Sequence, residues 1–295
     1  MTPKLVIAGI GEVLWDVYPD AARFGGAPAN FACHASALGA DATMVSAVGN
    51  DDLGNRAIDT LARAQVHHDT VATDAAHETG QVRVTLDLNG QPTYEFATDT
   101  AWDNLTWSPE LESLATRCDA VCFGTLAQRS AKSRETIQRF LQSTSRTALL
   151  MFDVNLRQHF YDGEVIQQSL ERASAVKLNE DELPIVAHLC GIEEAPLTKM
   201  LRELIERFDL RLGALTCGAA GAVIIAGNEE STHPALPTKV LDTVGAGDAF
   251  TATLVCDFLK GRKLVDMNRH ANAVASYVCS QPGAVMDLPA ELRDA

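Results

Sequence analysis

Short apolar runs alternate with longer, more polar segments along most of the chain. The apolar runs predict buried strands at residues 4–10, 42–49, 119–123, 147–153, 174–178, 212–216 and 222–226. The segments between and after them predict helices, among them residues 28–38, 56–64, 133–142, 164–173, 197–208 and 267–279. This alternation predicts an α/β fold in which helices cover a mainly parallel sheet.

Residues 81–96 follow a different pattern. Apolar and polar side chains alternate from Val82 to Leu88, and the pair Asn89-Gly90 is a strong signal for a two-residue hairpin turn. An antiparallel hairpin among parallel units predicts a small β appendage, which could cover a site as a lid or contact a second subunit. A plain edge hairpin is the alternative.

The composition narrows the class of protein. The chain has 295 residues, of which 46% are hydrophobic, and this suits one large α/β domain with a sizeable core. A net charge of −15 argues against nucleic acid or an anionic membrane as a partner. We therefore expect any phosphate site to be built locally, from backbone amides and a few cations.

The sequence also carries signals about location. No secretory leader precedes residues 4–8, and no apolar run reaches the length of a membrane span. The seven cysteines are dispersed without Cys-x-x-Cys spacing, which is typical of reduced thiols. We therefore expect a cytoplasmic protein.

Polar residues follow the predicted strands at the point where each strand ends. Such runs lie at residues 12–16, 124–126, 153–157, 179–182 and 218–221. Because the carboxyl ends of parallel strands meet at one edge of a sheet, we expect these runs to line a single groove. Asp16 could bind a substrate hydroxyl there, with a loop-capping role as the alternative. Arg157 and Lys177 are the candidate cations, with an ordinary surface position as the alternative.

Residues 242–250 form the first of two glycine turns. Gly245 and Gly247 would expose backbone N–H groups at the start of a helix that continues to about Gly261, and the helix dipole favours an anion at that end. Asp248 would place a base beside the anion, as transfer of a phosphoryl group to an alcohol requires. A tight strand-to-helix connection is the alternative. The chain has no Gly-x-x-x-x-Gly-Lys-Ser/Thr motif, so the usual P-loop route to ATP is excluded.

Residues 24–30 form the second glycine turn. Pro28 suits the first position of a helix, and Asn30 lies in its first turn. The Asn30 amide could cap the backbone or bind a sugar hydroxyl. His34, one turn further on, is expected to be a core histidine, because no partner carboxylate is visible near it in the sequence.

With both glycine turns identified, the sequence resembles the ribokinase-like (PfkB) carbohydrate kinases over essentially its whole length. The resemblance rests on residues 25–30, Gly-Gly-Ala-Pro-Ala-Asn, and residues 242–248, Asp-Thr-Val-Gly-Ala-Gly-Asp, in the expected order and separation. Residues 11–16, 101–103 and 124–130 are similar to features of fructokinases.

The family fold gives a more detailed expectation for the architecture. The resemblance implies a single domain over residues 1–295, built as a three-layer α/β/α sandwich with a mainly parallel central sheet. It also implies a small β-sheet lid formed by residues of about 12–26 and 80–104.

The resemblance implies ATP-dependent phosphorylation of a primary sugar hydroxyl, with Mg²⁺ and, on a weaker match, K⁺ as cations. The matching catalytic positions are Asp248 as the base and Gly245, Ala246 and Gly247 as the anion hole. The matching sugar-binding positions are Asp16, Gly25, Gly26, Asn30, Trp102 and Arg157. The matching nucleotide-binding positions are Lys177, Asn179, Thr216, Gly218, Gly221 and Asn272. The matching cation positions are Asn179 and Glu182 for Mg²⁺ through its waters, and Asp242, Val244 and Gly283 for a monovalent cation.

D-Fructose, converted to fructose 6-phosphate, is the expected substrate. Ala27 and Pro28 stand where ribokinases carry lysine and glycine, which argues against ribose and toward a hexose. One alternative is a 2-keto-3-deoxy-sugar-acid kinase, with Arg157 or Arg129 facing the carboxylate. A nucleoside kinase with tryptophan stacking and a non-catalytic sugar sensor are the others. The expected partners are a sugar and ATP, and the lid is also compatible with a homodimer.

Overall fold

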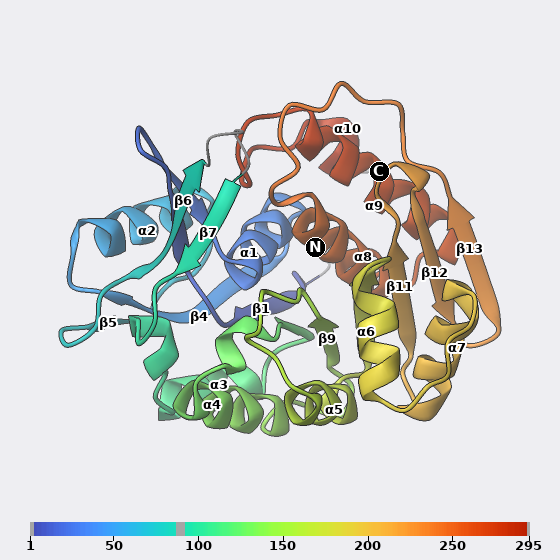
Figure 1. The fold of residues 1–295 in the computed structure, drawn as a ribbon, viewed down its shortest axis with the longest axis horizontal. Coiled ribbons are helices and arrows are strands. Elements are labelled where there is room, and N and C mark those ends of the chain that lie inside the picture. Colours follow the sequence, from blue (N-terminus) through green and yellow to red (C-terminus); the bar gives the residue numbers. More distant parts are fainter. Residues whose placement is uncertain (1–2, 87–91, 294–295) are drawn as a thin grey trace.

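A nine-stranded sheet forms the centre of the computed structural model, which describes residues 3–86 and 92–293 (Figure 1). The strand order is β13-β12-β11-β10-β9-β8-β1-β4-β5. The strands are β1 (Val6–Ile10), β4 (Asp41–Gly49), β5 (Val71–Asp74), β8 (Ala120–Phe123), β9 (Leu149–Asp153), β10 (Ala175–Asn179), β11 (Leu212–Thr216), β12 (Ala222–Ala226) and β13 (Glu229–His233). Pairing is parallel from β5 to β11, and β12 and β13 continue the sheet in antiparallel pairs. The predicted mainly parallel sheet is confirmed.

Helices cover both faces of this sheet, so that the molecule has three layers (Figure 1). The helices α1 (Ala27–Ala37), α8 (Ala246–Leu259) and α9 (Leu264–Cys279) share one core cluster with the sheet. The opposite cluster contains α3 (Pro109–Ala115), α4 (Ala131–Gln142), α5 (Gly163–Arg172), α6 (Glu182–Leu189) and α7 (Leu197–Arg207). The remaining helices are α2 (Asp52–Arg63), which packs near β4, and α10 (Ala290–Arg293).

The continuous apolar runs of the sequence follow from this burial on both faces. In β8 and β9, Phe123 and Phe152 stack with ring centroids 5.2 Å apart in one core cluster. Their neighbours Cys122 and Met151 point into the opposite cluster. A strand buried on both sides needs an apolar side chain at every position, because successive side chains alternate between the two faces.

A second sheet, in the order β3-β2-β6-β7, lies beside the first. It consists of β2 (Leu14–Val17), β3 (Ala22–Gly25), β6 (Gly80–Leu86) and β7 (Pro92–Phe96). The alternation in residues 81–85 is confirmed, since Val82 and Val84 are buried while Arg83 and Thr85 are exposed. The strands β6 and β7 pair in antiparallel fashion, as predicted, although the predicted turn at Asn89-Gly90 and Leu88 before it lie outside the described residues.

Several short elements were not predicted from the hydrophobic pattern. The edge strand β13 consists mostly of polar and charged residues, and β5 has only four residues, so neither gives an apolar run. The helix α6 carries a proline in its first turn and follows the polar run that ends β10 directly.

The described helices include none with both the length and the apolar character that crossing a membrane requires. All seven cysteines carry free thiols in the structure.

Gly80 and Trp102 connect the second sheet to the body of the protein. Trp102 lies in the 3₁₀ turn of residues 101–104 and is only 1% exposed. The Arg129 guanidinium lies 4.1 Å from the centre of the Trp102 ring and donates two hydrogen bonds to the Asp103 carboxylate, at 2.8 and 2.7 Å. A Cβ atom at Gly80 would overlap Trp102 Nε1 and lie 2.6 Å from its Cδ1 atom. The base of the second sheet therefore requires glycine at this position.

Gly80→Ala should destabilise the protein, because neither the indole nor the adjacent backbone has room to move. Overpacking of this kind costs about 1 to 3 kcal/mol of unfolding free energy. Thermal unfolding measures the effect. Gly163→Ala is the matched control, because its nearest neighbour would be Leu189 Cδ2 at 3.8 Å. Equal unfolding temperatures for the two variants would contradict this packing.

Candidate active site

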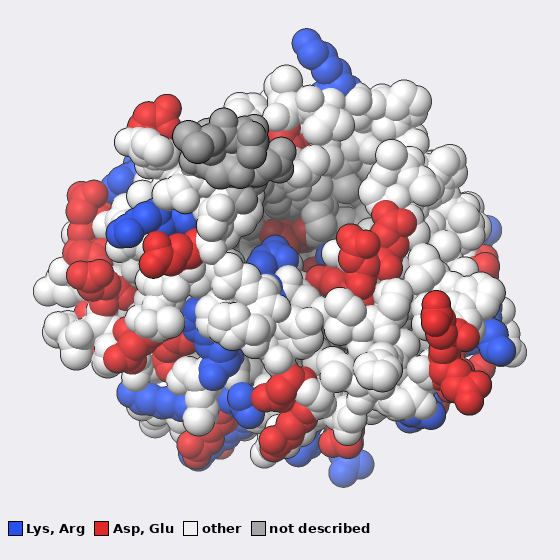
Figure 2. Space-filling model, viewed as in Figure 1, with Lys and Arg blue, Asp and Glu red and all other residues white. Residues whose placement is uncertain are grey.

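The predicted groove lies where β1, β9, β10 and β11 end and α8 begins. Figure 2 shows this face of the molecule hollowed near its middle, with acidic and basic side chains inside the hollow. The two glycine turns both open onto this region: one leads into α1 and the other into α8. The convergence of strand ends that the sequence predicts is therefore present.

Gly245 shapes the turn before α8. Its φ is +80°, in the left-handed region that favours glycine, and it caps the helix N-terminus. A Cβ atom at this position would lie 2.6 Å from the carbonyl oxygen of Ala284. Ala246 and Gly247 follow as the first helical residues, and their N–H groups have no partner earlier in the helix. The Ala246 N–H makes a long contact of 3.3 Å with the carbonyl oxygen of Thr243, and that of Gly247 has no such partner among the described residues, so the turn can present amide hydrogens to an anion.

Asp248 and Asn30 join the two glycine turns. Asn30 Nδ2 donates a hydrogen bond of 2.8 Å to Asp248 Oδ2. The pKa of Asp248 is raised to about 6, mainly by burial and also by the negative charge of Asp153, while the Asn30 hydrogen bond and the positive charges of Lys177 and Arg157 act in the opposite direction. A carboxylate with a pKa near neutrality is suited to accept a proton at physiological pH.

Lys177 and Asp153 form a buried ion pair beneath the α8 turn. Lys177 Nζ donates to Asp153 Oδ1 at 3.1 Å, and both side chains are less than 10% exposed. Burial would lower the pKa of Lys177, but the carboxylates of Asp153, Glu182 and Asp248 outweigh it and raise that pKa. A Cβ atom placed on Gly247 would lie 3.1 Å from Lys177 Nζ. The ammonium group therefore carries its positive charge directly beside the predicted anion hole.

Thr251 completes this network from the next turn of α8. Its Oγ1 atom donates to Asp153 Oδ2 at 2.7 Å and lies 2.9 Å from the carbonyl oxygen of Gly247. Asp153 therefore holds both the lysine and the helix that carries Asp248.

Glu12, Asp16 and Arg157 lie on the side of the groove near the second sheet. Glu12 is 2% exposed, burial raises its pKa to about 7, and its Oε1 atom accepts the Ala27 N–H at 3.3 Å. Burial also raises the pKa of Asp16, while Arg157 and Arg23 act in the opposite direction. Arg157 is exposed, so its guanidinium is available to a ligand.

A cavity of about 650 Å³ adjoins the other side of the α8 turn. Its walls contain five of the six predicted nucleotide-binding residues, which are Asn179, Thr216, Gly218, Gly221 and Asn272. Ala246 and Gly247 also line this cavity, together with Phe250 and residues 235–238. The lining is largely apolar and could hold a flat aromatic base, with the anion turn at one end.

Asn179 and Glu182 organise the end of β10. Asn179 Oδ1 accepts the N–H groups of Asp181 and Glu182, and Glu182 accepts those of Asn179 and Leu156. Among the residues that the structure describes, no group of three or more His, Cys, Asp or Glu side chains could hold a metal by itself. This donor set fits a Mg²⁺ ion that arrives on nucleotide phosphates and keeps its own waters, rather than an ion held by protein ligands alone.

The three residues predicted for a monovalent cation are also close together. Asp242 accepts the Val244 N–H on Oδ1 at 3.1 Å and the Gly283 N–H on Oδ2 at 3.2 Å. However, Arg23 Nη1 lies 3.1 Å from the same Oδ2 atom. A guanidinium group therefore already faces the Asp242 carboxylate.

The structure places Trp102, which was predicted to bind the substrate, in a packing position. The side chain is buried against Gly80 and Arg129 at the base of the second sheet and has no surface left for a ligand. Arg129, the alternative partner for a sugar carboxylate, is also buried and is paired with Asp103. Both residues lie in segments similar to features of fructokinases, but the sequence does not distinguish a packing role from a binding role.

Three residues of this site were not assigned a role from sequence: Glu12, Asp153 and Thr251. Asp153 is the last residue of β9 and so obeys the rule that polar groups gather at strand ends. Thr251 could have been predicted to belong to the site, because it lies four residues after Gly247 and so on the same face of the helix. Nothing in the sequence shows that Glu12 is buried.

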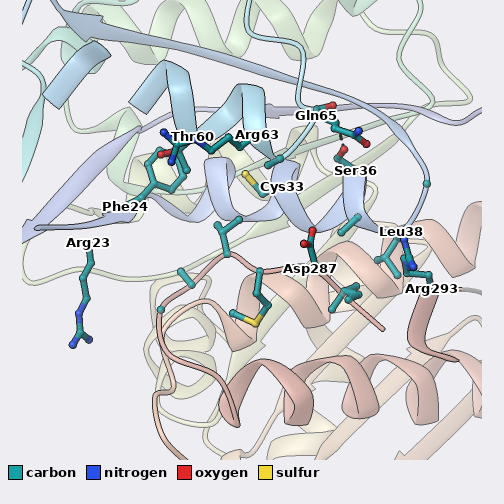
Figure 3. Close-up of a pocket in the computed structure, with 18 of the residues that line it drawn as sticks. Arg23, Phe24, Cys33, Ser36, Leu38, Thr60, Arg63, Gln65, Asp287 and Arg293 are labelled. Carbon is teal, nitrogen blue, oxygen red and sulfur yellow. Dashed lines mark hydrogen bonds between the residues drawn. The ribbon is translucent and has the colours of Figure 1, made fainter. Parts of the chain in front are cut away.

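A larger cavity of about 1160 Å³ lies between α1, α2 and residues 283–293 (Figure 3). Ser36 and Gln65 face each other across part of it, with a hydrogen bond of 3.2 Å. Gly283 is the only predicted site residue in its lining, and Asp248 is not part of it. This cavity is therefore separate from the groove described above.

Comparison with known proteins identifies the class. Residues 21–291 match the pfkB family of carbohydrate kinases, and the chain belongs to that family. It is 33% identical over 258 residues to a fructokinase of Klebsiella pneumoniae, with 83% of this chain and 82% of that protein covered. The crystal structure of an uncharacterized sugar kinase, PH1459, from Pyrococcus horikoshii in complex with ATP matches with a TM-score of 0.80 at 30% identity, covering 94% of this chain and 93% of that one.

A fructokinase of Vibrio cholerae O395, solved with fructose, ADP and a calcium ion, has the same fold, with a TM-score of 0.81 at 24% identity over 98% of this chain and 97% of that one. The ribokinase-like fold is thereby confirmed. The protein is an ATP-dependent sugar kinase.

Lys177→Met should destabilise the protein, because it leaves the Asp153 carboxylate buried without its partner. Removal of one member of a buried pair typically costs about 3 to 5 kcal/mol of unfolding free energy. Adding Asp153→Asn should recover part of the loss, since the amide is uncharged and still accepts from Thr251. Urea unfolding of the single and double variants measures both changes. If the double variant were less stable than Lys177→Met, the pairing would not be the source of the effect.

Proposed function

We propose that the protein transfers the γ-phosphoryl group of ATP to the 6-hydroxyl of D-fructose. The observation that carries this proposal is the contact between Asn30 and Asp248 at the edge of the anion turn. Asp248 lies between the 650 Å³ cavity, whose wall includes Gly247, and the turn that carries Asn30. A base in this position separates a nucleotide side from an acceptor side.

In the proposed reaction the acceptor hydroxyl donates a hydrogen bond to Asp248 and loses its proton to it as the oxygen attacks. Amides of residues 245–248 and the Lys177 ammonium stabilise the charge that spreads over the transferred group. Phosphoryl transfer needs little covalent help from the protein, so positioning and charge stabilisation supply most of the rate. Asn30 keeps the carboxylate turned toward the acceptor.

Mg²⁺ would neutralise the phosphate oxygens of the bound nucleotide. Its place in the proposal is the phosphate end of the cavity, near Asn179 and Glu182. Both side chains already accept backbone N–H groups, so we expect them to act on the ion through its water shell.

The sugar side of the groove supports a neutral hexose over the alternatives. Asp16 provides a carboxylate and Asn30 an amide, and Gly25 and Gly26 let the backbone approach a ligand closely. Together these groups suit a ligand with several hydroxyl groups. The tryptophans expected to stack on a nucleoside are not accessible: Trp15 and Trp102 are buried, and Trp107 is partly buried with Arg139 stacked on its ring. Arg157 remains available for a sugar acid, which therefore stays the second candidate.

Two further expectations belong to this proposal. Residues 12–26 and 80–104 would act as a lid over the acceptor, because β2 and β3 carry Asp16 and Gly25 within the second sheet. We also predict that two copies of the chain pair through that sheet, because its edge strands β3 and β7 each have one side without a partner strand in the described chain. Measuring the oligomeric state in solution tests this prediction.

The proposal is tested by ADP release with fructose, ribose, 2-keto-3-deoxygluconate and adenosine. We expect fructose to give the highest kcat/KM, with phosphorylation at carbon 6 identified by NMR. A higher value for 2-keto-3-deoxygluconate would shift the assignment to the sugar acid.

Asp16→Ala should raise KM for the preferred sugar at least tenfold, with little change in KM for ATP. A larger change in KM for ATP would place Asp16 on the nucleotide side of the groove.

Asp248→Asn should lower kcat by about 10² to 10⁴-fold, the range that general base catalysis contributes. Calorimetry should show ATP binding little changed, and a variant with a tenth of the wild-type kcat would contradict the assignment.

In the wild type, kcat/KM should fall about tenfold per pH unit below pH 6, because the base must be ionised and burial holds its pKa at about 6. A flat profile down to pH 5 would contradict the same role.

A further inference from the structure

Asp242, at the start of the anion turn, is surrounded by hydrogen-bond donors. Its Oδ2 atom receives Arg23 Nη1 at 3.1 Å and the Gly283 N–H at 3.2 Å, and its Oδ1 atom receives the Val244 N–H at 3.1 Å. The side chain is only 15% exposed. The carboxylate thus fixes the Gly283 loop against the turn, and Arg23 is its positively charged partner.

A backbone carbonyl oxygen next to Asp242 also accepts hydrogen bonds. The carbonyl oxygen of Cys279, at the end of α9, accepts the N–H groups of Leu241 at 2.8 Å and Asp242 at 3.3 Å. K⁺ is bound by oxygen atoms that replace its hydration shell. At Asp242, however, the positive charge within contact distance of the carboxylate is the Arg23 guanidinium.

Arg23 reaches Asp242 from the second sheet, with its side chain 51% exposed. It lies on β3, opposite Asp16 in the β2–β3 register, and its guanidinium carbon is 4.9 Å from the centre of the Tyr18 ring. Figure 3 shows the side chain extending away from α1 and α2, and its partner Asp242 belongs to the turn before α8. One residue therefore connects the strand pair that carries Asp16 to the turn that carries Asp248.

We propose that Arg23 supplies at Asp242 the positive charge that a monovalent cation would otherwise supply, so that turnover does not require K⁺. The guanidinium balances the Asp242 carboxylate and keeps the Gly283 loop and residues 242–245 in place. In the same contact it joins β3 of the second sheet to the anion turn. The inference rests on the proposed role of residues 245–248 in phosphoryl transfer, and Arg23 acts in it as a positioning residue.

The experiment compares turnover in tetramethylammonium chloride and in KCl at equal ionic strength. The wild type should have the same kcat in both salts. Arg23→Gln should lose at least tenfold in kcat in tetramethylammonium and regain at least fivefold in KCl, because the vacated carboxylate can then take an ion. Arg23→Lys should behave as the wild type. Arg83→Gln is the matched control, since Arg83 is an exposed arginine of the same sheet, 3.7 Å from Glu95, and should change neither value.

Thermal unfolding in the two salts gives a readout that does not depend on the substrate. K⁺ should raise the unfolding temperature of Arg23→Gln and leave that of the wild type unchanged. Activation of the wild type by K⁺ of fivefold or more, a K⁺-dependent unfolding temperature in the wild type, or full K⁺-independent activity of Arg23→Gln would each overturn the proposal. Failure to phosphorylate fructose would contradict the proposed substrate alone, because the unfolding temperatures still decide the role of Arg23.

Discussion

The hydrogen bond between Asn30 and Asp248 is the interaction on which the site depends. It joins two glycine turns that are 218 residues apart in sequence, each at the start of a buried helix. The helices α1 and α8 pack on the same face of the large sheet, which brings their N-termini together. A site of this kind needs no long loops, because the sheet places both turns and the turns place the amides.

The charges of the site are balanced below the surface. Asp153, Lys177 and Thr251 form one buried network, in which the lysine offsets a carboxylate and also presents its ammonium to the anion turn. The same carboxylate raises the pKa of Asp248, so a single aspartate influences both the phosphate side and the base. In a chain with a net charge of −15, Lys177 and Arg157 are the local cations that attract a polyanionic nucleotide.

The parallel sheet and the two glycine turns were predictable, because each produces a strong local signal: apolar runs for strands buried on both faces, and glycines where the backbone meets another chain segment. The roles of Trp102 and Arg23 were not. Trp102 looks like a ligand-binding aromatic until Gly80 is seen to require its indole, and Arg23 looks like a surface residue until Asp242 is seen 3.1 Å away. Pairings between residues distant in sequence decide such roles, and one sequence does not display them.

Ala284 lies where the end of the chain meets its beginning. Its carbonyl oxygen accepts the His34 Nε2–H at 2.8 Å across 250 residues, and its backbone also leaves no room for a side chain at Gly245. Burial lowers the pKa of His34 to about 4, so this imidazole stays neutral and acts as a fixed donor. During synthesis on the ribosome, the segment around Ala284 emerges after α1 and after the turn at Gly245. The nascent chain can therefore build its sheet while it still lacks a finished anion turn, and catalytic competence should appear only after the segment around Ala284 has emerged.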